Sequence, residues 1–64
     1  MPWTSDYYPV SMRRLSPATR EKAIEIANAL LAEQMQEGMA IRVAISRAKQ
    51  WAQRRGLPTT EDEE

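Results

Sequence analysis

Cysteine and histidine are both absent from this 64-residue sequence. Without them there is no disulfide, no usual zinc site, no cysteine nucleophile and no histidine general base. Only two glycines occur, Gly38 and Gly56, so the sequence has no glycine-rich phosphate-binding loop. These gaps argue against an enzyme, and we expect no catalytic residues, no metal site and no cofactor.

Long apolar runs are also missing. The longest one, at positions 29–32, is far shorter than the roughly 20 residues that a membrane-spanning helix needs. The chain does not open on a basic, then apolar, then small-residue leader of the secretory type. We therefore expect a cytoplasmic protein with no membrane span.

The first 15 residues are rich in large apolar side chains, whereas Pro2 and Pro9 disfavour a long helix there. A chain this short buries only about 60% of its unfolded surface, so its core is marginal and needs these groups. We interpret residues 1–15 as an apolar strap that completes the core, in preference to an exposed aromatic recognition patch. Its large apolar residues are Trp3, Tyr7, Tyr8, Val10, Met12 and Leu15.

Two helices are predicted after the strap. Ser16 followed by Pro17 is a typical helix start, with the serine accepting hydrogen bonds from free amide groups. Apolar residues then recur at helical spacing, which predicts a first helix over residues 17–37. Gly38 is expected to end this helix, in a tight turn at 36–39. The second helix is expected over 39–55, where Gly56 and two following residues, one apolar and one proline, end it.

The predicted fold is all-α: a two-helix hairpin with the N-terminal apolar strap packed across it. We expect one small domain over 1–57 and a disordered acidic tail over 58–64, because residues 59–64 offer nothing apolar to bury. Truncation after Pro58 should then shift the melting temperature by only a few degrees. The expected core is Trp3, Tyr7 or Tyr8, Leu15, Ile24, Ala27, Leu31, Ile41, Ala44, Ile45, Ala48 and Trp51.

The formal net charge is zero, but the second helix carries five cations and no acid. Two alanine-rich helices approach closely and leave little room for a small-molecule cavity of about 300–1,000 Å³. We therefore predict that the working surface is the outer side of the second helix. Val43 is the apolar residue beside this face, and packing under Trp3 or Tyr8 is the alternative for it. The candidate partner surface is Arg42, Val43, Ser46, Lys49, Gln50 and Gln53.

The favoured function is a non-enzymatic interaction or regulatory module that acts through a protein partner or self-association. The alternative is a nucleic-acid-binding module whose basic helix contacts phosphates through Arg42 and Lys49, helped by Arg13 and Arg14. A helix-turn-helix alignment on Gly38 does not support that alternative. It leaves polar residues at most of the positions where the motif needs apolar ones.

Several short motifs occur in a distinctive order. They are M-P-W at the start, D-Y-Y-P at 6–9, R-E-K-A-I-E-I-A-N-A-L-L at 20–31, E-G-M-A-I at 37–41 and A-K-Q-W-A at 48–52. Together they resemble the YdaT-type domain of unknown function, found in small bacterial proteins, with a fainter similarity to ChaB-type proteins labelled cation transport regulators. The resemblance implies a small helical protein of the bacterial cytoplasm and assigns no catalytic or binding residues. The ChaB-type label would suggest regulation.

Overall fold

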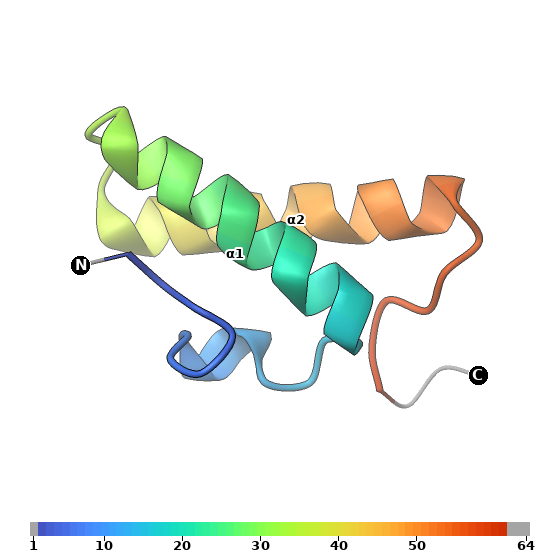
Figure 1. Cartoon of the computed structure of the whole chain (residues 1–64). Helices are drawn as coiled ribbons and strands as arrows, with labels where there is room; N and C mark the ends of the chain where they lie inside the picture. Colours follow the sequence, from blue (N-terminus) through green and yellow to red (C-terminus); the bar gives the residue numbers. More distant parts are fainter. Residues whose placement is uncertain (1, 62–64) are drawn as a thin grey trace.

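Helices make up most of the chain in a computed structural model that describes residues 2–61. A short 3-10 helix, η1 (Val10–Met12), precedes two α-helices, α1 (Pro17–Ala32) and α2 (Glu37–Arg54). Helix α1 lies obliquely across α2, and the strap runs beside α1 before leading into it (Figure 1). The predicted all-α hairpin with an N-terminal strap is confirmed. No helix within residues 2–61 is long and apolar enough to cross a membrane.

Helix α1 starts where the sequence predicted, but its cap differs from the expectation. Ser16 has extended backbone angles and Pro17 is the first helical residue. The Ser16 hydroxyl is buried and forms no hydrogen bond within the described residues, so the predicted side-chain cap is wrong. Instead the Ser16 amide donates to the carbonyl of Thr59, 3.2 Å away, which ties the helix start to the C-terminal segment.

The predicted end of α1 at residue 37 is wrong, because the helix ends at Ala32. Gln34 adopts the left-handed conformation, with φ of 69°. The amide of Met35 donates to the carbonyl of Leu30 over 3.1 Å, and the amide of Gln34 donates to that of Leu31 over 2.9 Å. This Schellman pattern closes the helix without glycine. Gly38, expected to end α1, instead lies in the first turn of α2.

The predicted end of α2 is confirmed to within one residue. Gly56 has φ of 69°, a conformation that favours glycine because it has no Cβ. The amide of Leu57 donates to the carbonyl of Ala52 over 2.8 Å, and the amide of Gly56 donates to that of Gln53 over 3.1 Å. The chain then turns back toward the start of α1 (Figure 1).

Small side chains allow α1 and α2 to pack closely. Every fourth residue of α2 from Ala40 to Ala52 is a fully buried alanine, and α1 contributes buried Ala23 and Ala27. Trp3, Tyr8, Ile26, Ile41 and Ile45 are half-buried against the core cluster. The prediction missed Met12, which is fully buried, and named Leu31 where Leu30 is buried instead. Of the predicted alternatives Tyr7 and Tyr8, Tyr8 packs against the core and Tyr7 is 59% exposed. Trp51, also predicted in the core, is only half-buried.

The C-terminal segment differs from the predicted disordered tail over residues 58–61. Thr59 is 5% exposed, and the hydroxyl of Thr19 donates to the carbonyl of Pro58 over 2.8 Å. The amide of Glu61 donates to the carbonyl of Arg14 over 2.8 Å, so the segment pairs with the end of the strap. This part of the tail therefore closes the domain, and the rest of the predicted tail lies outside the described residues.

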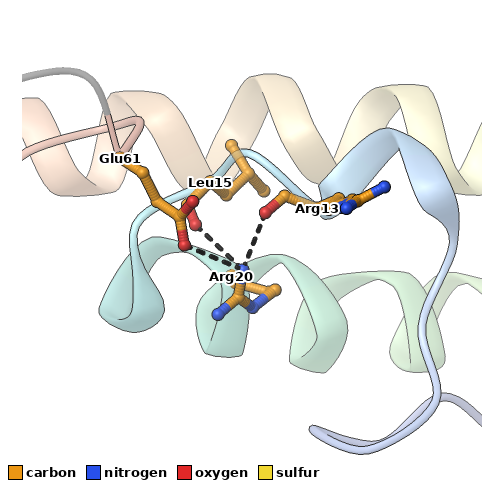
Figure 2. Close-up of polar contacts among 4 residues, drawn as sticks. All are labelled: Arg13, Leu15, Arg20 and Glu61. Atoms are coloured by element: carbon orange, nitrogen blue, oxygen red, sulfur yellow. Dashed lines mark hydrogen bonds and ion pairs between the residues drawn. The ribbon is translucent and has the colours of Figure 1, made fainter.

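Arg20 joins α1, the strap and the C-terminal segment. Its Nη1 atom donates to the carbonyls of Arg13 and Leu15, at 2.9 and 3.1 Å, and lies 3.8 Å from a carboxylate oxygen of Glu61 (Figure 2). Its guanidinium carbon also lies 5.0 Å from the centre of the Tyr8 ring. We call the contacts of Arg20 with Arg13, Leu15 and Glu61 the clasp. The sequence alone did not reveal it.

Candidate partner surface on α2

The outer side of α2 carries a shallow hollow of about 470 Å³. Residues three, four and seven apart on a helix lie on one face, which explains why this set converges. The hollow brings together four of the six predicted surface residues and adds two that the prediction did not name, Met39 and Arg47. We call it the Val43 hollow, and its lining is Met39, Arg42, Val43, Ser46, Arg47 and Gln50. The predicted residues Lys49 and Gln53 do not line it.

Val43 is half-buried and faces this hollow. The alternative prediction placed Val43 under the strap aromatics. Among the described residues, Val43 is not one of the apolar side chains that pack against the core cluster. The strap aromatics are engaged elsewhere: the Trp3 ring lies 5.1 Å from that of Tyr7, and the Trp3 backbone exchanges two hydrogen bonds with the Asn28 side chain. Beside Val43, Met39 is 51% exposed. Apolar surface therefore remains available on this side of α2.

A second hollow of about 580 Å³ adjoins the first and shares Arg47 and Gln50 with it. We call it the Trp51 hollow, and its lining is Arg47, Gln50, Trp51, Arg54 and Arg55. The guanidinium carbon of Arg55 lies 5.0 Å from the centre of the Trp51 ring, and the Lys22 ammonium lies 5.5 Å from it. These distances are within the range of cation–π attraction.

Sequence reasoning missed the Trp51 hollow because it assigned the indole to the core. The signal was present, since Arg47, Arg54 and Arg55 lie four residues before and three and four after Trp51. On a helix this spacing places the cations around the ring. The two hollows have volumes in the small-molecule range, contrary to the expectation of little room, but they are grooves open to solvent beside α2.

The cations of the two hollows have no acidic partner in the part of the chain that the structure describes. The ion pairs found there are those of Arg20 with Glu61 and of Lys22 with Glu25. Among residues 2–61, Arg47, Arg54 and Arg55 therefore present guanidinium groups that no carboxylate pairs with. Arginine forks recognise carboxylates and phosphates, so the arrangement is chemically suited to binding an anionic group.

The chain is similar to the uncharacterized protein YdaT of Bacillus subtilis (strain 168). The two are 44% identical over 62 residues, which cover 97% of this chain and 41% of the relative. This similarity supports a YdaT-type domain in the chain. It spans about two fifths of the length of that relative. No family model matches the chain, and no solved structure matches it significantly.

The YdaT-type resemblance predicted from the motifs is thus confirmed, whereas these comparisons do not show the fainter ChaB-type similarity. The matched relative is itself uncharacterized, so it transfers no activity or partner to the YdaT-type domain. Function has to be inferred from the two hollows of α2.

Proposed function

We propose that this YdaT-type domain is a non-enzymatic interaction module of the bacterial cytoplasm that contacts a protein partner through the outer side of α2. The observation that carries the proposal is the Val43 hollow. It combines the exposed Met39 and the half-buried Val43 with flanking arginine and amide side chains.

This composition is typical of protein interfaces. Methionine and arginine are enriched at interfaces relative to the rest of the surface, and binding energy concentrates in a few central side chains that a partner shields from water. The flexible, polarizable side chain of Met39 can adapt to the shape of a partner. Val43 would supply the apolar centre of the contact, with Arg42 and Arg47 beside it.

Nucleic-acid binding is the weaker alternative. Domains that bind nucleic acid are commonly basic, with an isoelectric point above about 9, whereas this chain has a sequence pI near 6.3 and no net charge. Of the cations expected to contact phosphates, Arg13 lies on the strap rather than on α2. If the alternative holds, replacing Arg42 and Lys49 with glutamine reduces both DNA affinity and its salt dependence.

Val43→Asp tests the proposal. We expect the folded variant to capture at least about tenfold less partner from native lysate, because a carboxylate at the apolar centre costs about 1.4 kcal/mol or more of binding free energy. The measurement is photo-crosslinking from a probe at Met39, followed by mass spectrometry of the captured protein. A captured second copy of this chain would identify self-association.

Ala29→Asp is the matched control, because it adds the same side chain at an exposed position of α1. We expect it to capture partner as the unchanged chain does. Circular dichroism establishes that both variants are folded. Equal capture by the two folded variants would remove the outer side of α2 as the contact surface.

A further inference from the structure

The Trp51 hollow concentrates positive charge around a half-buried aromatic ring. Arg47, Gln50 and Arg54 are exposed, and Arg55 lies over the indole. Five cations occupy positions 42–55, and no acid occurs after Glu37 in this helix. Because the whole chain is neutral, its acids lie elsewhere and the two sides of the hairpin differ in charge.

Within residues 2–61, no carboxylate pairs with these cations. Neither the Arg47 nor the Arg54 side chain forms a hydrogen bond or ion pair among residues 2–61, in contrast to Arg20, whose Nη1 has three oxygen neighbours. Exposed charges held close together repel one another and gain from an anionic partner. Among the features of the described surface, the positive charge at the Trp51 hollow therefore indicates most clearly which kind of ligand would bind.

We propose that the Trp51 hollow binds carboxylates of an acidic protein segment. The inference rests on the proposed interaction function and deepens it, since the shared residues Arg47 and Gln50 make the two hollows one continuous surface. Val43 and Met39 contact the apolar part of the partner segment. Arg47, Arg54 and Arg55 bind its aspartate or glutamate side chains by charge-assisted hydrogen bonds.

The spacing of the arginines sets the length of that segment. Arg47 and Arg54 are seven residues apart, which corresponds to a rise of about 10 Å along a helix. An extended peptide covers about 3.3 Å per residue, so acidic residues about three positions apart span this distance. A helical partner would present acids two turns apart.

Two observations favour an acidic peptide over a nucleic acid. The ring of Trp51 already has the Arg55 guanidinium and the Lys22 ammonium over it, so it is not an open platform for stacking a base. On the α1 side of the same ring, Glu21 and Glu25 line the neighbouring hollow. These carboxylates repel a polyphosphate strand that tracks along the surface, whereas a short acidic segment on α2 need not approach them.

Titration of the full chain with hexaglutamate tests the inference, with hexaglutamine as the uncharged control. Calorimetry on the unaltered chain measures affinity at low salt. Trp3→Phe leaves Trp51 as the single tryptophan, so its emission reports on the hollow. We expect saturable binding of hexaglutamate that changes Trp51 emission and weakens with salt. Hexaglutamine should not bind.

Arg54→Gln should weaken hexaglutamate binding about fivefold, the upper range for one exposed ion pair. Arg13→Gln is the control, because it removes the same charge from an exposed position on the strap. Absence of hexaglutamate binding, or equal loss in the two variants, would overturn the inference. Tighter binding of a twelve-residue thymidine oligonucleotide, with the same dependence on Arg54, would also overturn it in favour of nucleic acid.

These outcomes are separable from those for the proposed function. Val43→Asp could lose partner capture while the unaltered chain fails to bind hexaglutamate. That result would keep the proposed interaction surface and overturn only the proposal of an acidic ligand. Unchanged capture in Val43→Asp removes the proposed surface, and the proposal of an acidic partner segment on it then falls as well.

Discussion

Arg20 and Arg55 each lie 5.0 Å from the centre of an aromatic ring, yet their surroundings differ. The Arg20 side chain is 17% exposed, and its Nη1 atom is near two carbonyl oxygens and the Glu61 carboxylate (Figure 2). Arg55 is exposed, and within residues 2–61 its side chain lies over the Trp51 ring and forms no ion pair.

The difference separates two roles for the same residue type. An arginine whose hydrogen bonds are satisfied inside the domain stabilises the fold, and its loss leaves carbonyl groups without a donor. An arginine on an open surface adds little to stability but keeps its donors available to a ligand. We therefore assign Arg20 to the fold and Arg55, with Arg47 and Arg54, to binding.

The largest expected effect is that of Arg20→Gln. Hydrogen bonds to charged groups contribute about 1.5–3 kcal/mol each, and the variant loses the charge that the two carbonyls and Glu61 share. We expect the free energy of unfolding to fall by about 3 kcal/mol. Thermal denaturation should show a melting temperature about 15 °C lower, given 4–8 °C per kcal/mol for a domain of this size.

Arg13→Gln is again the control, because the clasp uses only the Arg13 carbonyl and not its side chain. Its free energy of unfolding should stay within about 0.5 kcal/mol of that of the unchanged chain. If both variants melt at the same temperature, the contrast between Arg20 and the surface arginines is lost.

Truncation after Pro58 should have the next largest effect. It removes the buried Thr59, the carbonyl that accepts from the Ser16 amide, and Glu61. At about 1 kcal/mol per hydrogen bond, we expect a loss of about 2 kcal/mol, measured by urea denaturation. A shift of only a few degrees in melting temperature would instead support the expectation from the sequence that the tail is dispensable for folding.

A double-mutant cycle sharpens that test. Arg20→Gln and the truncation both remove the contact between Arg20 and Glu61. Their combined effect should therefore be smaller than the sum of the separate effects, since sites in direct contact are not additive. Full additivity would mean that the clasp contributes no coupling between α1 and the C-terminal segment.

Sequence reasoning predicted the two helices and the end of α2, because Pro17, Gly56 and the apolar periodicity act locally. It placed the end of α1 five residues too far along the chain. Gln34 and Gly56 have the same φ of 69° and close their helices by the same hydrogen-bond pattern. Glycine is a preference at this position rather than a requirement, so Gly38 was a misleading signal.

The docked C-terminal segment was beyond sequence reasoning for a different reason. Its contacts with Ser16 and Arg14 are backbone hydrogen bonds, which any residue other than proline can donate. For the candidate site, helical spacing was enough to group Val43 with Arg42 and Ser46. It did not reveal that Trp51 would be half-buried, since an aromatic residue in a marginal domain is expected in the core.

The smallest expected effect completes the comparison. Arg55→Gln removes one cation from the Trp51 ring, and an exposed cation–π contact contributes about 0.5–1 kcal/mol. The melting temperature should therefore fall by about 8 °C at most. The emission of Trp51 in a Trp3→Phe background should change, because a charge beside the indole is gone. The affinity of Arg55→Gln for hexaglutamate should fall, as the affinity of Arg54→Gln does. A destabilisation as large as that of Arg20→Gln would mean that the Trp51 hollow is held for the fold. Arg55 would then stabilise the fold and could not be assigned to binding a partner.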